Sequence, residues 1–527
     1  MSTSIRSIVL ALVLGALLAP AAAQANQSQM SIMMDDDLLV YRNDRTAARA
    51  LTQMKSVGVD TVRVTVLWET IAEFARFTKA DMAKLKGTKN RRAREAARRQ
   101  NRRFKPANPS PYPIRNWDRY DNLVRAAAQR NIRVYFNITG PGPKWAHAKR
   151  PKGSTAIARS FKPRPREFKL FVTAVGKRFS GTYRDENGTR AELPRVSMWS
   201  LWNEPNQAGW LSPQWENGRP ASPALFRKLY QQGYAGLVAS GHRADNDIIL
   251  LGETAPLGVD EKTGKSPMRP KQFLRELFSG DLGSGLPASG FAHHPYTKNQ
   301  SPLQRDPHPD SLTMANINEL GALLDQMAAS TGKVPANLPL YMTEYGFETN
   351  PPDPFSGISY DLQAKYNTLG EYLAYVNPRV ASQAQFLLVD GAPVRSKPKT
   401  SKSYWFTYQS GLYTQRGQPK PAAYAYQMPF LVTATGVDPE TAAPTAHVWG
   451  QVRFIPTAQA TTVEIQWKPK DNSTGWLAVG APLPTDPLRG YFEATLTAPL
   501  AQPGDWRAVW YLPDGTVGVF TGGSDGT

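Results

Sequence analysis

The sequence of 527 residues predicts an α/β fold, a (β/α)8 barrel followed by a C-terminal β-sandwich. Across residues 26–428, short apolar runs typical of buried parallel strands alternate with segments whose apolar residues recur at helical spacing. Over residues 429–527, apolar and polar residues alternate between turns, a pattern typical of antiparallel strands. The chain is long enough for a barrel of about 250 residues or more and a smaller second domain.

The barrel elements are expected in a regular order along the chain. Residues 30–34 are apolar and precede Asp35-Asp36-Asp37, which predicts a first strand that runs into an acidic loop. Residues 46–56 carry apolar residues at helical spacing and predict the first helix. Further strands are expected at 61–68, 132–137, 195–202, 248–253, 290–296, 338–344 and 382–389, and further helices at 117–130, 165–179, from Ser222-Pro223 onward, 311–330, 360–375 and 420–426.

The C-terminal part predicts a β-sandwich because residues 463–467 and 506–510 each alternate apolar with polar side chains. Such a domain either binds carbohydrate or only packs on the barrel, and the sequence leaves both interpretations open.

Two of the expected strands end in a carboxylate. The apolar and aromatic residues 195–202 are followed by Asn203-Glu204-Pro205, and the apolar residues 338–342 are followed by Thr343-Glu344. The functional groups of α/β barrels lie at the carboxyl ends of the strands. A single glutamate at a strand end is more often a capping or surface residue. Two glutamates at strand ends match the requirement of glycoside hydrolysis for one protonated carboxylic acid and one ionised carboxylate.

These residues also carry a family resemblance, which extends over residues 30–426. Trp202-Asn203-Glu204-Pro205-Asn206 resembles the acid/base motif of clan A glycoside hydrolases, and Thr343-Glu344-Tyr345-Gly346 resembles their nucleophile motif, with families 5 and 39 the most similar. The resemblance implies that Glu204 and Glu344 lie at the ends of the fourth and seventh barrel strands. It also implies hydrolysis with retention of the anomeric configuration, with Glu204 as acid/base, Glu344 as nucleophile and no cofactor or metal.

The resemblance further implies a set of residues around the two glutamates. Arg63 resembles the clan arginine beside the nucleophile, where a fixed cation would keep Glu344 ionised; the alternative is an arginine that pairs with a structural acid. Asn203 is expected to contact the 2-hydroxyl of the sugar. His294 and Tyr296 match the His-x-Tyr of the clan, with the tyrosine near the nucleophile and the histidine near the acid/base.

Two polar features near the strand ends have an alternative interpretation. His293 and His294 suggest a metal site, but neighbours on a strand point to opposite faces and do not readily share one ion. Glu253 is a third carboxylate at a strand end and is the reserve candidate for a substrate contact.

Two tryptophans are candidates for stacking on a sugar. Trp145 follows a rigid Gly140-to-Pro143 turn, and it either stacks on substrate or covers the barrel rim. Trp405 is expected to replace, as the platform beneath the reacting sugar, the tryptophan that clan members carry at the end of the eighth strand.

The charge of the chain is concentrated in one insertion, at about residues 75–115. The formal net charge is +20, and residues 79–105 contain twelve lysines and arginines against two acids. This segment is interpreted either as a solvated, partly helical loop or as a site of attraction for an anionic wall polymer or lipid headgroup. Nucleic acid is the less favoured partner because aromatic residues are few and no binding motif accompanies the charge.

The N-terminus has the pattern of a secretory signal peptide over residues 1–25. Arg6 precedes an apolar run from Ile8 to Leu18, and Ala23-Gln24-Ala25 resembles a cleavage site. The expected location is therefore secreted or extracellular, including association with the cell wall, with an uncleaved N-terminal anchor as the alternative. No later stretch of about 18 apolar residues predicts a membrane span. The sequence contains no cysteine, which excludes disulfides and thiolate chemistry.

Together these observations predict a secreted retaining glycoside hydrolase that cleaves β-glycosidic bonds of a poly- or oligosaccharide. The basic insertion makes an anionic or wall-associated glycan one expected substrate. Two alternatives remain open at this point. The same site would serve a transglycosylase, and an inactive barrel would serve a non-catalytic cell-wall carbohydrate-binding protein.

Overall fold

A computed structural model describes residues 25–87, 90–187, 191–453 and 461–511, together with the backbone of 517–522 and 524–525. The signal peptide expected at residues 1–25 therefore lies outside the described residues, apart from Ala25. Every helix within the described ranges is too short or too polar to span a bilayer.

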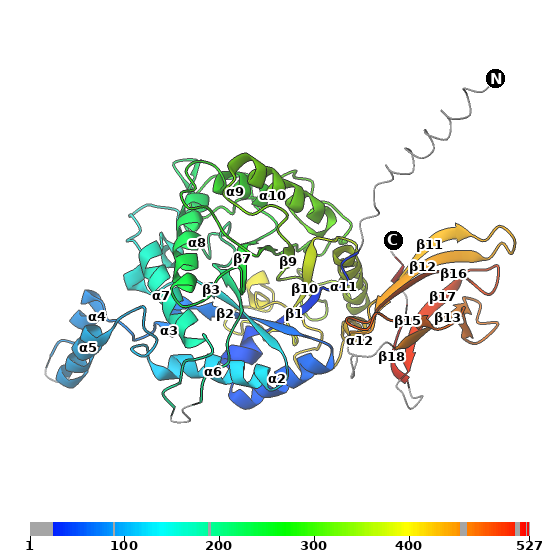
Figure 1. The fold of residues 1–527 in the computed structure, drawn as a ribbon, viewed down its shortest axis with the longest axis horizontal. Helices are drawn as coiled ribbons and strands as arrows, with labels where there is room; N and C mark the ends of the chain where they lie inside the picture. The colour runs from blue at the N-terminus through cyan, green and yellow to red at the C-terminus, as the bar shows by residue number, and fades with distance from the viewer. Residues whose placement is uncertain are drawn as a thin grey trace, which may run out of the picture.

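Eight parallel strands close into a barrel, in the spatial order β1-β10-β9-β8-β7-β4-β3-β2 (Figure 1). Every pairing around the barrel is parallel, and the strands are buried along most of their length. The (β/α)8 barrel predicted from the sequence is confirmed. Its strands are β1 (Met30–Met34), β2 (Thr61–Leu67), β3 (Arg133–Thr139), β4 (Met198–Leu201), β7 (Ile248–Thr254), β8 (Gly290–His293), β9 (Leu340–Met342) and β10 (Val380–Phe386).

The long helices of the barrel lie outside the strands and begin where the sequence supplies capping residues. The side chain of Asn43 accepts a hydrogen bond from the Thr46 amide, and Ser359 accepts one from the Leu362 amide. The helices of the barrel are α2 (Asp44–Ser56), α6 (Ile114–Ala128), α7 (Pro165–Arg178), α8 (Ser222–Val238), α9 (Pro270–Leu277), α10 (Ile317–Thr331), α11 (Tyr360–Tyr375) and α12 (Pro421–Gln427). Shorter helical turns are η1 (Asp37–Tyr41), α3 (Trp68–Ile71), η3 (Lys144–Ala146), η4 (Ala158–Ser160), η5 (Met314–Asn316) and η6 (Lys402–Tyr404).

Several strands are shorter than the sequence predicts, among them β9, which covers only Leu340–Met342 of the expected 338–344. The strand expected at 195–202 begins at Met198, because the Val196 amide donates to the carbonyl of Phe179 after α7 instead of joining the sheet. The strand expected at 290–296 ends at His293, because Pro295 lacks the amide that a ladder requires.

The barrel interior is filled by a layer of side chains. Ile32, Tyr135, Met198 and Leu250 belong to one buried cluster within the barrel, and a larger apolar cluster lies between strands and helices. Because the interior is packed, a ligand site must lie at an end of the barrel.

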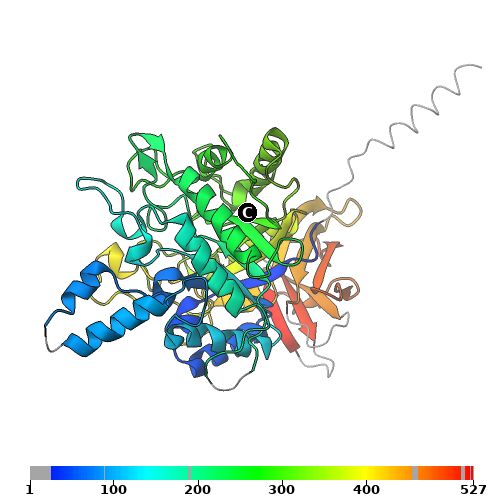
Figure 2. The same cartoon turned by 60° about the vertical axis from the view of Figure 1, so that its left-hand side comes forward.

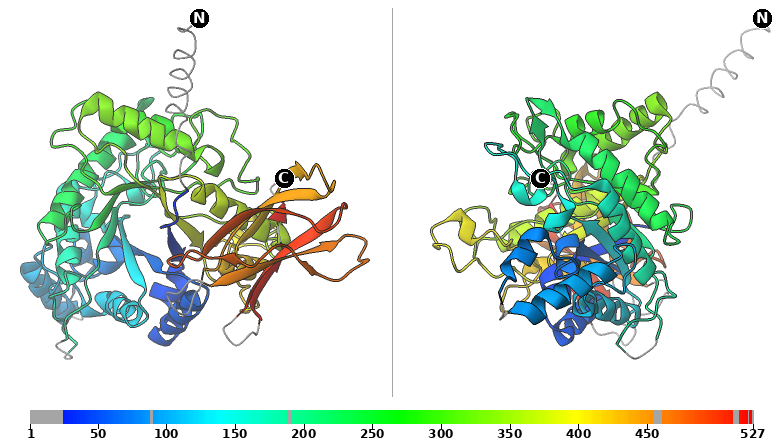
Figure 3. Two further views of the ribbon diagram at one scale, coloured as in Figure 1. Left: turned by 45° about the vertical axis from the view of Figure 1, so that its right-hand side comes forward. Right: turned by 90° about the vertical axis from the view of Figure 1, so that its left-hand side faces the viewer.

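The C-terminal part forms two facing sheets, antiparallel apart from one short parallel pair, so the predicted β-sandwich is also confirmed (Figure 3). Phe430, Val448, Ile465 and Ala508 belong to the core between the sheets. One sheet contains β16 (Tyr491–Thr497), β12 (Pro444–Gln451), β11 (Phe430–Val437) and β19 (Ser524–Asp525), and the other contains β14 (Leu477–Ala478), β13 (Thr462–Pro469), β15 (Leu483–Pro484), β17 (Gly504–Tyr511) and β18 (Val517–Gly522).

The sandwich packs against the amino-terminal end of the barrel strands and against α11. Trp449 is fully buried against Tyr372 and Tyr375 of α11, with ring centroids 5.3 Å apart in each pair. Arg453 forms an ion pair with Glu371 at 3.0 Å and donates to the hydroxyl of Ser31, near the start of β1, at 2.8 Å. Packing on the barrel, one of the two interpretations of this domain, is therefore observed.

The basic insertion leaves the barrel after β2 and contains α4 (Lys79–Lys84) and α5 (Arg91–Arg103). These helices form an arm that projects from the side of the barrel (Figures 1 and 2). The expectation of a partly helical insertion at residues 75–115 agrees with this arrangement.

Candidate active site

A cavity of about 570 Å³ opens at the carboxyl ends of the barrel strands. Glu204 and Glu344 both line it, together with Asn203 and Tyr296. Its aromatic lining consists of Tyr41, Trp210, Tyr296, Phe355, Phe386, Trp405, Phe406 and Tyr408. No described residue after 428 contributes to the lining, so the sandwich does not form part of this site.

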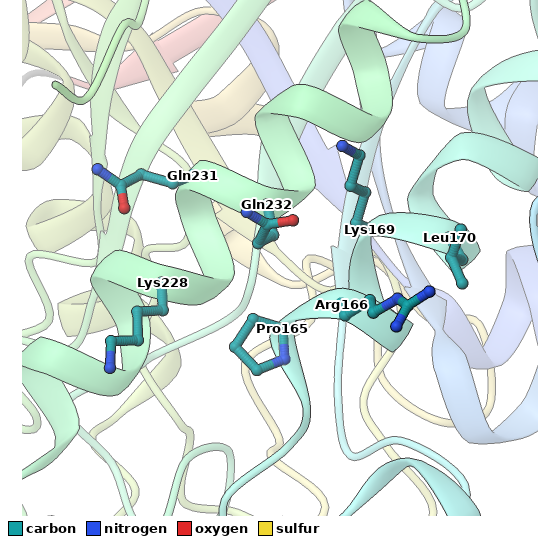
Figure 4. A pocket seen from close by; sticks show the side chains of 7 residues that line it. All are labelled: Pro165, Arg166, Lys169, Leu170, Lys228, Gln231 and Gln232. Carbon is teal, nitrogen blue, oxygen red and sulfur yellow. The ribbon is translucent and has the colours of Figure 1, made fainter. Parts of the chain in front are cut away.

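A second hollow of about 540 Å³ lies on the outer surface, between α7 and α8 (Figure 4). Arg166 and Lys169 of α7 and Lys228 of α8 line it. These side chains belong to the helical layer, and no carboxylate is among the described residues of its lining. The cavity at the strand ends is therefore the candidate active site.

The backbone is strained where β4 and β7 end. Trp202, Glu204 and Glu253 have φ values of 77°, 36° and 54°, in the left-handed region that side chains other than glycine rarely adopt. Neighbouring groups hold this conformation, since the Trp202 amide donates to the carbonyl of Ile138 and the Glu204 amide donates to that of Glu253. Strain of this kind persists where the surrounding structure compensates for it, and it concentrates at functional sites.

The Glu344 carboxylate is held on both of its oxygens. Arg63 Nη1 donates to Oε1 at 2.9 Å, and the Tyr296 hydroxyl donates to Oε2 at 3.1 Å. Burial raises the pKa of Glu344, while the nearby cations His294 and Arg63 oppose that rise. These contacts match the places that the sequence resemblance implied for Arg63 and Tyr296.

Glu204 lies opposite Glu344 across the site. Its Oε1 is 3.0 Å from His294 Nδ1, and its side chain keeps 20% of its surface exposed to the cavity, against 10% for Glu344. One carboxylate oxygen of Glu204 and one of Glu344 lie within 4.8 Å of each other. The two carboxylates predicted from sequence are thus neighbours with different surroundings.

Glu253 does not line the cavity, and this corrects its expected role as a substrate contact. Its side chain is fully buried behind Arg63 and His294, which reach it at 2.9 Å and 2.6 Å. Burial opposes its ionisation, but Arg63 and His294 outweigh burial and hold the pKa of Glu253 well below its ordinary value. The donors around this carboxylate are Arg63, His294, Tyr135, Ser200 and Thr343.

Glu253 is therefore a buried anion that fixes both cations of the site. The sequence left two interpretations of Arg63, a contact with Glu344 or an ion pair with a structural acid. Both are observed, because Arg63 forms ion pairs with Glu344 and with Glu253.

His294 is a cation at neutral pH. Burial alone would lower its pKa, but the carboxylates of Glu344, Glu204 and Glu253 raise the pKa of His294 to about 10. A protonated imidazole donates from both nitrogens, and these donate to Glu204 and Glu253.

The ligand atoms of Glu204, His294 and Glu344 also lie close enough together to surround a metal ion. Both ring nitrogens of His294 already contact carboxylates in this structure, Nδ1 that of Glu204 and Nε2 that of Glu253. The adjacent His293 points elsewhere, because its ring contacts the Thr254 hydroxyl at 2.8 Å and the Leu312 carbonyl at 3.0 Å.

The two candidate tryptophans lie in different surroundings. Trp405 lines the cavity from the turn after η6, next to Phe406. Trp145 is not among the described residues of the cavity lining; its ring packs edge-on against Trp68 and Phe104, and Arg76 lies over it at 5.3 Å. Trp145 therefore corresponds to the rim interpretation, because Phe104 and Arg76, on the segments that flank the arm, cover its ring.

The similarities found among known proteins are to solved structures, with TM-scores below 0.5. No protein-family model matches the chain, and no curated protein matches it. A monomeric β-xylosidase from Caulobacter crescentus CB15 superposes with a TM-score of 0.48 at 13% identity, over 92% of this chain and 98% of the other. A β-glycosidase from Thermosphaera aggregans superposes with a TM-score of 0.43 at 14% identity, over 76% and 96%.

A third solved structure is a glycoside hydrolase family 5 mannosidase from Rhizomucor miehei in complex with mannosyl-fructose. Its TM-score is 0.39 at 12% identity, over 75% of this chain and 88% of the other. These solved structures are glycoside hydrolases, the class whose motifs the sequence resembles. The barrel itself is established by the strand pairing within this chain.

Several cavity residues were not singled out from the sequence. Asp36, Glu348 and Asp353 are acidic, and Phe355, Phe406 and Tyr408 are partly exposed aromatics at 46%, 70% and 43%. All of them lie in loops, where no periodic pattern marks a functional residue. Among these residues, only Glu348 could have been recognised from the sequence, because it lies four positions after Glu344.

Glu348 gives a prediction about stability. Burial and the neighbouring Asp353 raise its pKa to about 7 from 4.5. A carboxyl with a raised pKa binds its proton more tightly in the folded state, so its ionisation lowers stability as pH rises from about 4.5 to 7. Glu348→Gln should raise Tm at pH 8 by about 2 °C and leave Tm at pH 4 unchanged. The exposed Glu440→Gln is the control for differential scanning calorimetry, and equal shifts of Glu348→Gln at both pH values would contradict the prediction.

Proposed function

We propose that this protein is a retaining β-glycosidase that acts on a poly- or oligosaccharide, with Glu344 as nucleophile and Glu204 as acid/base. The observation that carries the proposal is the pair of carboxylates on one cavity, with oxygens within 4.8 Å of each other. Retaining enzymes place these groups about 5–5.5 Å apart, whereas inverting enzymes need about 6.5–9.5 Å to admit a water molecule. The proposal includes export from the cell, which residues 1–25 lead us to expect.

In the first step, Glu344 attacks the anomeric carbon while the bond from that carbon to the leaving oxygen breaks. Glu204 transfers its proton to the leaving oxygen, and a glycosyl ester forms on Glu344. In the second step, Glu204 takes a proton from water, the water oxygen attacks the anomeric carbon, and the Glu344 carboxylate is released.

The charges of the site support this division of roles. Arg63 and His294 are two cations, and Glu204, Glu253 and Glu344 are three carboxylates, so one proton among the carboxylates makes the cluster neutral. Glu253 and Glu344 each contact the Arg63 guanidinium directly, while Glu204 contacts only His294. The proposed mechanism requires this proton on Glu204.

The neighbouring groups supply substrate contacts. Asn203 Oδ1 accepts from Arg63 Nη2 at 2.7 Å, which leaves the amide NH₂ of Asn203 to donate to the 2-hydroxyl of the sugar. Trp405 offers an aromatic face on the cavity wall for the reacting sugar. Tyr296 and Arg63 keep the Glu344 carboxylate oriented for in-line attack.

The test is the stereochemistry of hydrolysis by the purified chain. Aryl β-glycosides and β-glycans of gluco, manno, xylo and arabino configuration are incubated with it, and ¹H NMR follows the first anomer released. The β-anomer should appear first, and first release of the α-anomer would refute the retaining mechanism. Products that lengthen at high acceptor concentration would reassign the same site to transglycosylation, and binding of a glycan without any cleavage would favour a carbohydrate-binding protein.

A further inference from the structure

The helix α5 of the basic arm carries seven arginines and one glutamate. Six of the arginines are exposed and Arg94 is partly exposed. The arginines are Arg91, Arg92, Arg94, Arg98, Arg99, Arg102 and Arg103. The helix thus presents a dense cationic surface along its whole length.

The arginines of α5 are not balanced by carboxylate partners among the residues that the structure describes. Within the described part of the chain, no ion pair includes any of the seven, whereas Arg275 pairs with Asp310 and Arg42 pairs with Asp37. Like charges four residues apart, as at Arg98 and Arg102, oppose helix formation. The surface is therefore not arranged for the stability of the isolated chain, and an external anion would relieve the repulsion.

The arm is held in place at its base. Asn101 Oδ1 accepts from the Phe77 amide at 2.8 Å and its Nδ2 donates to the Phe77 carbonyl at 2.9 Å, while Gln100 Nε2 donates to the Pro111 carbonyl at 2.6 Å. Phe104, just after the helix, packs against Tyr112 with ring centroids 5.1 Å apart. These contacts present the arginines on a fixed helix, which lowers the entropy lost on binding a ligand.

The arm and the cavity lie at the same end of the barrel. The insertion begins directly after β2, and Thr65 and Leu67 of that strand line the cavity. Figure 2 shows α4 and α5, in blue, extending outward from the barrel. The arm therefore starts from the end of the barrel at which the cavity opens.

Most of the aspartate, glutamate, lysine and arginine side chains that line the cavity are carboxylic acids, whereas those of the arm are mostly arginines. Asp36, Glu348 and Asp353 line the cavity beside the two proposed catalytic glutamates, against the two lysines Lys298 and Lys402. An anionic sugar at the reacting position would therefore face an excess of carboxyl groups, while the arginines of α5 suit carboxylate, sulfate or phosphate groups.

We propose that α5 is a docking surface for an anionic polysaccharide, whose charged groups contact the arginines while an uncharged sugar of the same polymer enters the cavity. This inference rests on the proposed glycosidase function and names its substrate class. A polysaccharide fits better than nucleic acid because α5 contains no aromatic residue on which bases could stack. It fits better than a membrane because α5 has no large apolar side chain to insert into a bilayer.

The experiment compares two variants of the full chain with equal loss of charge. The arm variant carries Arg98→Gln, Arg99→Gln, Arg102→Gln and Arg103→Gln. The control carries four exposed arginines changed elsewhere, Arg45→Gln, Arg49→Gln, Arg243→Gln and Arg416→Gln. Binding to polygalacturonate and to heparin is measured by titration at several salt concentrations, with a neutral β-glucan, duplex DNA and phosphatidylserine vesicles as competing probes.

The arm variant should bind at least one of the two anionic polysaccharides at least tenfold more weakly, with a smaller dependence on salt, while the control stays within twofold of wild type. The proposal would be overturned if both variants bound the polysaccharides equally weakly, or if neither variant bound them more weakly than wild type. Tighter binding of DNA or vesicles than of either polysaccharide would also overturn it. Hydrolysis of an aryl β-glycoside should be unchanged in the arm variant. If the wild-type chain hydrolysed no glycoside but still bound the polysaccharide through the arm, the proposed glycosidase function would be refuted. The proposal that α5 is a docking surface would stand.

Discussion

Glu344→Gln is expected to lower kcat/KM on every β-glycoside by about three or more powers of ten. The amide has nearly the same size as the carboxylate and keeps an oxygen for Arg63 or Tyr296, but it cannot form the glycosyl ester. Because the loss is chemical, circular dichroism and Tm should stay close to wild type. Glu192→Gln, an exposed surface change, is the control for kinetics.

Glu204→Gln should differ from Glu344→Gln in its dependence on the leaving group. A dinitrophenyl leaving group departs without a proton, so the first step survives and the glycosyl-enzyme accumulates because the second step lacks its base. Intact-protein mass spectrometry should then show one added sugar, and peptide mapping should place it on Glu344. An equal loss on dinitrophenyl and alkyl glycosides would contradict the role of Glu204 as acid/base.

Glu253→Gln is expected to lower kcat/KM by about 100-fold although the residue does not touch the cavity. Removing this buried anion leaves Arg63 and His294 without their shared partner, which costs about 3–5 kcal/mol of stability in buried pairs. The charge of Glu253 also helps to raise the pKa of His294, so its loss should lower that pKa. The alkaline limb of the kcat/KM profile should therefore move to lower pH.

The stability of Glu253→Gln should change with pH in the same sense. A histidine whose folded pKa is about 10 contributes stability that is complete below about pH 6.5 and is lost as pH rises toward 10. In Glu253→Gln the stability that His294 contributes should be smaller, and it should be lost at a lower pH than in the wild type. Urea unfolding between pH 6 and 10 measures it.

The matched control for Glu253→Gln is Glu186→Gln, which removes one carboxylate from the Arg178 and Asp121 cluster outside the cavity. It should lower stability without moving the pH profile of activity. Glu253→Asp should recover part of the activity. A Glu253→Gln variant with an unchanged pH profile would show that the residue has only a structural role.

The two proposed catalytic glutamates were accessible from sequence because each lies within three residues of the end of its own strand. The apolar runs before Glu204 and Glu344 define strands through local burial patterns, and parallel strands of one barrel place their carboxyl ends together. Their closeness therefore followed from two local patterns and one rule of architecture. The positions of Arg63 and Tyr296 beside Glu344 followed from the family resemblance, and the described contacts agree with them.

Glu253 and Trp145 show where the sequence was insufficient. Both stood at places that suggested substrate contact, yet Glu253 turns into the packed site and Trp145 packs against Phe104 at the base of the arm. Which way a side chain turns depends on the neighbours that surround it, and those neighbours come from distant parts of the chain. Arg63 and His294, for example, lie 190 and 41 positions from Glu253.

By itself the sequence determined the barrel, the sandwich, the basic insertion and the two carboxylates, because periodic apolar patterns, strand ends and net charge are properties of local segments. Only the tertiary structure decided that Glu253 holds both cations, that His294 is charged, and that loop aromatics such as Phe406 line the cavity. It also decided that the arginines of α5 stand on a fixed helix at the catalytic end. These features depend on barrel closure, which brings charges from separate strands within hydrogen-bond distance in a buried environment where each one controls the ionisation of the others.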